Sequence, residues 1–202
     1  MRVIGITGGV GAGKSAILDH IEENYNARVL KADEIAHDLM EPGTDCYRAL
    51  RKILPEEVFG RPEGRLNRPA LASLLFSREN LRESINGIVH PAVKVYIIDT
   101  ISKEREIGAL DYLVIEAALL IEEHYEKVCD ELWYIYTSQE NRRRRLMESR
   151  GYSEEKIARI FASQLGEEEY RRHCRVVIDN NGAMEDAFQE IDRALQSLQA
   201  RE

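Results

Sequence analysis

A glycine-rich segment near the N-terminus constrains the fold more strongly than any other part of the sequence. Residues 8–15 read GGVGAGKS, which fits the phosphate-binding pattern of a glycine, four residues and then Gly-Lys-Ser. Residues 2–7 are a short apolar run typical of a strand, and residues 15–22 have the apolar spacing of a helix. A strand, a glycine-rich turn and a helix start are the setting in which this pattern cradles a phosphate, so we predict a phosphate-binding loop here.

Each residue type in this loop has a chemical reason. Glycines allow the main chain to approach a phosphate closely, and the backbone N–H groups together with the helix N-terminus favour an anion. Lys14 is expected to reach the β- and γ-phosphates of ATP, and the Ser15 hydroxyl to hold Mg²⁺. A glycine-rich turn with a chance lysine is disfavoured because the loop, strand and helix patterns agree. The residues that we expect to bind ATP in this segment are Gly9, Val10, Gly11, Ala12, Gly13, Lys14, Ser15 and Ala16.

Composition and charge narrow the class of protein. The chain has 202 residues, of which 44% are hydrophobic, so an α/β domain with an insertion and a sizeable core is expected. A net charge of −8 argues against broad nucleic-acid binding, although a local basic patch can still bind a small anion. Cys46, Cys129 and Cys174 form no Cys-x-x-Cys pair, which disfavours a disulfide framework or a zinc site. Without a signal peptide or an apolar run of about 18 residues, we expect a cytoplasmic protein that does not cross a membrane.

Two acidic residues at the ends of predicted strands are candidates for chemistry. Residues 28–30 read as a second strand, and Asp33 follows at the end where parallel sheets bind ligands. Asp33 could accept a proton from a substrate hydroxyl or help to hold Mg²⁺, or it could instead cap the predicted helix 34–40. Glu116 ends a third strand, 111–116, and could orient Mg²⁺ or serve only as a cap or ion-pair partner. The pattern leaves these alternatives open.

A helical block separates the second and third strands. Residues 44–103 contain helical apolar spacing and no convincing strand, with a proline- and glycine-containing loop at 55–69. A long apolar stripe at 81–107 marks a further helical segment, and His90 and Pro91 interrupt this stripe. The block is interpreted as an insertion that closes over a substrate, or alternatively as a helical layer that only packs on the sheet.

A run of arginines follows the fourth predicted strand, residues 131–136. Residues 142–145 are four arginines in a predicted helix, and Arg150 follows. Four consecutive residues wind around most of a helix, so these arginines cannot all face one ligand. One or two of them could clamp a transferring phosphoryl group, because arginine matches phosphate geometry with paired hydrogen bonds. With the next helix, which begins at Ser153, the segment reads as a mobile lid that excludes water.

The alternation of strands and helices predicts the fold class. With a fifth strand at 175–178, we expect an α/β fold of the P-loop NTPase type, with a parallel five-stranded sheet and helices on both faces. The expected parts of this one kinase domain are a core (1–41, 108–141 and 174–202), a helical acceptor-binding insertion (42–107) and an arginine-rich lid (142–173).

A phosphate loop alone indicates nucleotide binding and not a reaction, so several functional classes are considered. A small-molecule kinase is favoured by the short chain, Asp33 and the arginine-rich segment. A GTPase-type switch would want an Asn-Lys-x-Asp element after a strand, and the sequence contains none. A nucleotide-binding interaction module without turnover is the remaining alternative, and the lid argues against it.

Several short blocks, taken in order, carry a specific resemblance. The first is ITGGVGAGKS at 6–15, where the double glycine after threonine is more specific than the general loop pattern. It is followed by ADEIA at 32–36, LNR at 66–68, His90-Pro91, LLIE at 119–122, Gln164 and IDNNG at 178–182. In this order and spacing the blocks resemble the dephospho-coenzyme A kinase family from about Val3 to Gly182.

This resemblance implies a reaction and its site. The expected reaction transfers the γ-phosphoryl of ATP to the ribose 3′-hydroxyl of dephospho-coenzyme A with Mg²⁺, giving coenzyme A and ADP. A nucleoside monophosphate kinase is the alternative within the kinases. The expected partners are ATP and dephospho-coenzyme A, and the chain is expected to be a monomer or weak homo-oligomer. The resemblance assigns catalysis to Asp33, Lys14 and Arg145, further ATP contacts to Arg142, Asn180 and Gly182, and acceptor contacts to Thr7, Asp33, Arg68, His90 and Leu119.

The sequence also departs from the family pattern. Position 31 is lysine, where the family often has a second aspartate, which weakens the case for a paired-carboxylate metal site there. Arg150 lies one position later than the lid arginine of many relatives, so the sequence leaves open which arginine reaches the phosphate.

Overall fold

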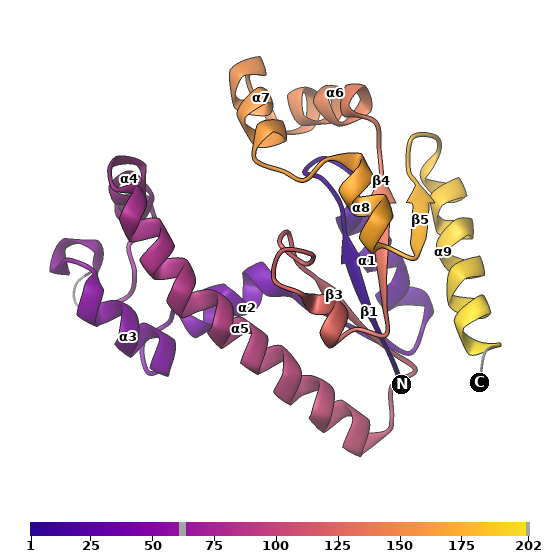
Figure 1. The fold of residues 1–202 in the computed structure, drawn as a ribbon, viewed down its shortest axis with the longest axis horizontal. Helices are drawn as coiled ribbons and strands as arrows, with labels where there is room; N and C mark the ends of the chain where they lie inside the picture. Colours follow the sequence, from indigo (N-terminus) through magenta and orange to yellow (C-terminus); the bar gives the residue numbers. More distant parts are fainter. Residues whose placement is uncertain (61–63, 201–202) are drawn as a thin grey trace. The chain divides into compact units, whose positions relative to one another are not determined.

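The computed structural model describes residues 1–60 and 64–200 (Figure 1). Its strands and helices follow in the order β1 (Arg2–Thr7), α1 (Lys14–Asn24), β2 (Ala27–Lys31), α2 (Ala32–Leu39), α3 (Asp45–Ile53), η1 (Glu56–Val58), α4 (Arg68–Ser77), α5 (Glu79–Ile107), β3 (Tyr112–Glu116), η2 (Tyr125–Lys127), β4 (Glu131–Tyr136), α6 (Gln139–Arg150), α7 (Glu154–Ala162), α8 (Glu167–His173), β5 (Val176–Asp179) and α9 (Met184–Gln199).

The chain divides into two compact units. One comprises Met1–Leu30 with Ile107–Glu202, and the other comprises Lys31–Glu106. The first unit contains nearly all of the sheet, the glycine-rich loop and the arginine-rich helices, whereas the second is built from helices α2 to α5.

The sheet has the strand order β2-β3-β1-β4-β5, which confirms the predicted five-stranded parallel sheet. Strand β1 lies between β3 and β4, and both pairings are parallel, with Ile4 opposite Val114 on one side and Glu131 on the other. The predicted bounds of β1 and β4 are those of the structure. Strand β3 begins one residue later than predicted, β2 is one residue longer at each end, and β5 is shifted by one residue.

One face of the sheet packs against helices α1 and α9. Alternate strand residues point to the same side of a sheet, and those that point to this side are apolar. Ile4 and Ile6 of β1, with Trp133 and Ile135 of β4, belong to this apolar cluster. The two helices contribute Ile17, Leu18, Ile21, Ala187, Ile191, Leu195 and Leu198.

The opposite face is covered by the segment after β3 and by helix α8. Gly5 of β1 faces Leu120 and Leu132, and a Cβ added to Gly5 would lie 2.7 Å from a methyl of Leu132. Tyr170 of α8 stacks on Tyr134 of β4 with ring centroids 4.6 Å apart. Helices therefore lie on both faces, as predicted, although α8 is a separate helix that the sequence pattern did not indicate.

The second unit has its apolar stripe on helix α5. The buried side chains Ile85, Val89, Val93, Ile97 and Ile101 recur every four residues along one face. The interruption of the stripe at His90 and Pro91 does not end the helix, because α5 runs continuously through both residues. Pro91 is exposed, so the helix loses one backbone hydrogen bond on its solvent side while the buried stripe stays in phase on either side of it.

The loop predicted at 55–69 has some regular structure. It contains the short helix η1 and a single antiparallel bridge between Phe59 and Leu66, and residues 61–63 of that prediction lie outside the described residues. In the described part of the chain, no helix is long and apolar enough to cross a membrane.

Candidate functional site: a phosphate loop beneath two arginines

The glycine-rich segment joins β1 to α1 as a tight loop. Gly11 and Gly13 have φ angles of +84° and +87°, a region that residues with a side chain rarely adopt. Helix α1 begins at Lys14, directly after Gly13, so its free backbone N–H groups lie at the end of the loop. The predicted sequence of strand, turn and helix is confirmed.

Lys14 contacts both a loop carbonyl and a neighbouring carboxylate. Its Nζ donates a hydrogen bond to the Gly8 carbonyl at 2.9 Å and lies 3.6 Å from Oε1 of Glu116. Both charged side chains are largely shielded from solvent, with 15% and 18% of their surface exposed. Glu116 is thus an ion-pair partner of the loop lysine, and its carboxylate partly offsets the positive charge of Lys14.

Ser15 lies in the first turn of α1 with an exposed side chain. Its hydroxyl makes no hydrogen bond with the residues that the structure describes. Within residues 1–60 and 64–200, no group of three or more His, Cys, Asp or Glu side chains could hold a metal ion. A single free hydroxyl fits Mg²⁺ that takes most of its oxygen ligands from nucleotide phosphates and water.

A buried network supports the loop from below. Asn180 is fully buried, and its Nδ2 donates to the Ala12 carbonyl at 2.7 Å. The Thr137 hydroxyl lies 3.1 Å from the Ala12 carbonyl and 3.1 Å from the Asn180 carbonyl. Sequence reasoning missed Thr137. The one available signal is its position directly after β4, at the carboxyl end of a parallel strand.

Arg145 reaches the same network from helix α6. Its Nη2 donates to the Asn180 carbonyl at 2.8 Å. Its Nη1 is buried and has no hydrogen-bond partner within the described residues, and it lies 3.5 Å from the position that a Cβ on Gly13 would take. Asn180 Oδ1 is a second buried atom without such a partner. A buried donor and a buried acceptor beside the loop are groups that a bound ligand could satisfy.

Arg142 lies beside the first part of the loop, at Gly9 and Val10, and is only 8% exposed. Its Nε donates to the Val10 carbonyl at 2.9 Å, and a Cβ on Gly9 would lie 2.1 Å from its Cζ. Burial lowers the pKa of the Arg142 guanidinium from its ordinary value. It makes no ion pair with any described carboxylate, so its positive charge is available to an anion at the loop.

The remaining arginines of helix α6 do not reach the loop. Arg143 pairs with Glu154 of α7 at 3.3 Å, with both side chains about half exposed. Arg144 is exposed, and Arg150 lies 6.0 Å from the ring of Tyr152. As expected from helical geometry, the four arginines do not share one face. Arg142 and Arg145, which are three residues apart and so lie on the same face of α6, are the two directed to the loop.

The other site residues predicted in this unit lie at or shortly after the carboxyl ends of strands. Thr7 is buried at the end of β1, with its hydroxyl 3.5 Å from the Ala117 carbonyl. Leu119 is 39% exposed in the turn after β3. Gly182 is exposed in the turn before α9, two residues after Asn180.

Asp33 belongs to the other unit, where it lies in the first turn of α2 with an exposed side chain. The helix begins at Ala32 and its N-cap is Lys31, which makes no side-chain capping hydrogen bond. The interpretation of Asp33 as the N-cap is therefore wrong, because the helix starts earlier than the sequence pattern indicated. Lys31 instead pairs with Glu34 at 3.5 Å.

Arg68 and His37 lie together on this unit. Nη1 of Arg68, the first residue of α4, lies 3.3 Å from Nδ1 of His37. His37 follows Asp33 by four residues in α2, so the two share one face of that helix. Arg68 therefore lies against the face of α2 that also carries Asp33, and sequence reasoning did not single out His37. His90 is half-buried on α5.

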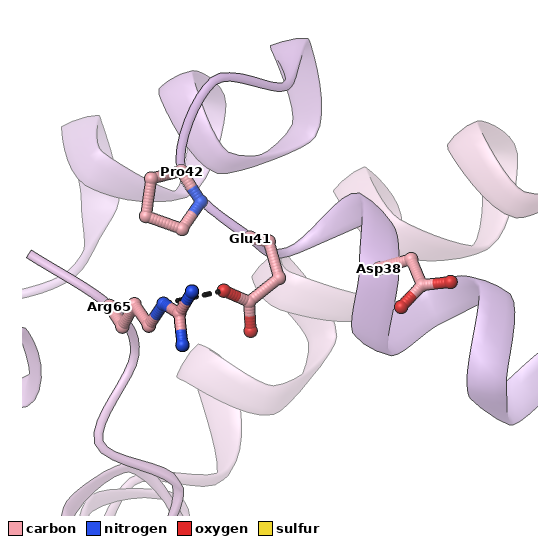
Figure 2. Close-up of a pocket in the computed structure, with 4 residues that line it drawn as sticks. All are labelled: Asp38, Glu41, Pro42 and Arg65. Carbon is pink, nitrogen blue, oxygen red and sulfur yellow. Dashed lines mark ion pairs between the residues drawn. The ribbon is translucent and has the colours of Figure 1, made fainter.

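A separate polar cavity of about 450 Å³ is lined by Asp38, Glu41, Pro42 and Arg65 (Figure 2). Arg65 and Glu41 point toward one another, with Nε and Oε2 3.3 Å apart, whereas the Asp38 carboxylate lies apart from them (Figure 2). The ion pair is exposed, so it contributes little to stability. Two carboxylates against one arginine disfavour an anionic ligand, and this cavity is not assigned to phosphate binding.

Comparisons with known proteins agree with this geometry. The family model described as dephospho-CoA kinase matches residues 2–186. The dephospho-CoA kinase of Geobacter sulfurreducens is 33% identical over 201 residues, which span 100% of this chain and 98% of that protein. The crystal structure of TT1252 from Thermus thermophilus has a TM-score of 0.77 and 31% identity, covering 99% of this chain and 97% of that one. The dephospho-CoA kinase from Campylobacter jejuni shares the fold, with a TM-score of 0.72, 19% identity and 98% of each chain covered. The chain therefore belongs to the dephospho-CoA kinase family.

Proposed function

We propose that the chain transfers the γ-phosphoryl group of ATP to the ribose 3′-hydroxyl of dephospho-coenzyme A, giving coenzyme A and ADP, the last step of coenzyme A synthesis. The observation that carries this proposal is the family match over residues 2–186, which includes the glycine-rich loop and its buried supports. The fold alone would not select an acceptor, because one fold serves many reactions.

On the ATP side, the proposed role of this chain is positioning and charge neutralisation. The backbone N–H groups of the loop and the N-terminus of α1 would receive the phosphates. Lys14 would reach the β- and γ-phosphates, while Arg142 contacts the loop at Val10 and Arg145 lies beside Gly13. Three cations around the transferring group suit phosphoryl transfer, in which catalysis rests on electrostatic stabilisation. We assign Asn180 and Gly182 to the adenosine end of ATP.

Mg²⁺ is the divalent ion that we infer for this reaction, and Ser15 is the residue that would hold it. When bound, Mg²⁺ neutralises charge on the β- and γ-phosphates. The exposed Ser15 hydroxyl next to Lys14 fits this task, and no protein cage of several carboxylates is needed.

On the acceptor side, we assign the base or hydroxyl-orienting role to Asp33. Its exposed carboxylate in the first turn of α2 is open to a substrate hydroxyl. Arg68, with its Nη1 3.3 Å from Nδ1 of His37, would supply positive charge to the anionic acceptor, and His37 would offer a further hydrogen bond. His90, Thr7 and Leu119 complete the proposed acceptor contacts.

The roles of the larger segments are also inferences. We assign residues 42–107 to acceptor binding and residues 142–173 to a lid that excludes water from the transfer. The net charge of −8 supports a protein without nucleic-acid partners. We further infer a cytoplasmic monomer or weak homo-oligomer, in which the free cysteines Cys46, Cys129 and Cys174 stay reduced.

An acceptor screen tests the proposal. ADP release from ATP and Mg²⁺ is followed in a coupled assay with dephospho-coenzyme A, AMP, CMP or shikimate as the acceptor. We expect stimulation by dephospho-coenzyme A alone. Stimulation by AMP or CMP would move the chain to the nucleoside monophosphate kinases, and binding of ATP without stimulation by any acceptor would favour an interaction module.

A further inference from the structure

The guanidinium of Arg142 is held by three different groups. On one side it meets the phosphate loop through the Val10 carbonyl, at 2.9 Å from Nε. On the other side it meets two residues near the end of α7: its Nη2 donates to Oε1 of Gln164, and its Cζ lies 4.5 Å from the ring centroid of Phe161. The planar group is therefore fixed in orientation between the loop and residues 161–164.

The chemistry of these partners is unusual for a buried arginine. A buried guanidinium is normally paired with a carboxylate, because an uncompensated charge is costly away from water. Here the partners within the described residues are a carbonyl, an amide oxygen and an aromatic face, and none carries a full negative charge. They orient the positive charge and leave it uncompensated.

The third nitrogen of the Arg142 guanidinium, Nη1, is the one that faces no acceptor among the described residues. The guanidinium occupies the space beside Gly9. A phosphate at the loop would supply both an acceptor for Nη1 and the missing negative charge.

We propose that Phe161 and Gln164 are positioning residues for ATP, which act through Arg142 by holding its guanidinium uncompensated against the phosphate loop. This inference rests on the proposed binding of ATP at the loop, but not on the identity of the acceptor. It also gives a physical link between the loop and the end of helix α7, since the same guanidinium contacts both.

The substitution Gln164→Glu separates positioning from structural support. Glutamate keeps the length of the side chain and its acceptor oxygen but places a carboxylate against the guanidinium, where it competes with phosphate. We expect the thermal midpoint to stay at or above that of the unsubstituted chain, because a new ion pair forms. We expect the Kd for ATP, measured by calorimetric titration with Mg²⁺ in the full chain, to rise about tenfold.

Phe161 is tested by a pair of variants. Phe161→Leu keeps apolar bulk and removes the aromatic face, and we expect the Kd for ATP to rise about threefold to tenfold. Phe161→Trp retains an aromatic face and is expected to restore affinity to within about twofold. The matched control is Arg144→Gln, on the same helix, whose exposed side chain makes no hydrogen bond or ion pair with the described residues.

Steady-state kinetics with dephospho-coenzyme A supply a second readout. For Gln164→Glu we expect the KM for ATP to rise with the Kd and kcat to fall as well, because Arg142 is one of the cations assigned to the transferring phosphoryl group. The proposal is overturned if Gln164→Glu and Phe161→Leu both bind ATP within about twofold of the unsubstituted chain while Arg142→Gln binds it much more weakly. Direct titration needs no acceptor, so a failure of the proposed acceptor would leave this test intact.

Discussion

Replacing Gly13 by alanine would strain the phosphate loop in two ways. Gly13 has a φ of +87°, and holding a residue with a Cβ there costs about 1–3 kcal/mol. The new Cβ would also lie 2.3 Å from Nδ2 of Asn180, a fully buried amide that donates to Ala12. The amide must move, and losing its hydrogen bond while leaving it unsatisfied costs about 1–3 kcal/mol more.

The sum, about 2–6 kcal/mol, is a large part of the stability of an ordinary domain. For a chain of this size it corresponds to a fall of roughly 5–20 °C in the thermal midpoint, measured by circular dichroism. ATP affinity should fall as well, because the Ala12 carbonyl that loses the Asn180 hydrogen bond belongs to the loop that carries the phosphate-binding N–H groups.

Gly166→Ala is the matched control in the same unit. Its φ is −70°, and an added Cβ would meet no atom within 4 Å. We expect its free energy of unfolding to stay within about 0.5 kcal/mol of the unsubstituted value. If Gly13→Ala were as stable as Gly166→Ala, the conformation that we describe for the loop and its contact with Asn180 would be refuted.

Three other substitutions test separate parts of the account. Asp33→Asn should bind ATP normally by calorimetric titration but lose most turnover, and near-normal turnover would rule out its role as the base. Thr137→Val keeps the shape of the side chain but removes the hydroxyl beneath the loop, so urea denaturation should show a loss of about 1–2 kcal/mol; an unchanged midpoint would mean that the buried hydrogen bond contributes nothing. Burial raises the pKa of Cys129 and of Cys174 to about 12 from an ordinary 9.0, so the folded chain binds more protons than the unfolded chain and stability should fall as the pH rises above about 9. Replacing both cysteines by alanine should reduce the slope of the free energy of unfolding against pH in that range, and an unchanged slope would show that these thiols do not titrate differently on folding.

The sequence predicted the local structure best at the phosphate loop, where the pattern of glycines allows few backbone conformations. The glycines of the loop, with an apolar strand before them and helical apolar spacing after them, predicted β1, α1 and their connection, because the pattern requires that local geometry. The strand predicted at 131–136 likewise matches β4, whose residues 132–136 are an unbroken apolar run.

Helix α5 shows where local rules fail. Pro91 predicts a break when it is considered alone, but the buried stripe from Ile85 to Ile101 continues past it. The packing of that stripe outweighs the single hydrogen bond that the proline removes, and this balance depends on tertiary contacts that a sequence pattern does not contain.

The candidate site was also only partly predictable from the sequence. Helical geometry alone predicted that only some of the four arginines could face one ligand, but not that Arg142 and Arg145 would be those directed to the loop. Thr137 and Gln164 reach the loop network through contacts across 125 and 22 residues of sequence, respectively. Such contacts depend on which elements pack together, and no local motif marks them.

The position of the transferred phosphate tests the central claim most directly. The chain is incubated with ATP, Mg²⁺ and dephospho-coenzyme A, and the product is examined by mass spectrometry and phosphorus NMR. The account predicts one equivalent of ADP for each added phosphate and a new monoester resonance on the ribose 3′-oxygen. Phosphate on another atom of the acceptor, or ADP released without a phosphorylated product, would contradict it.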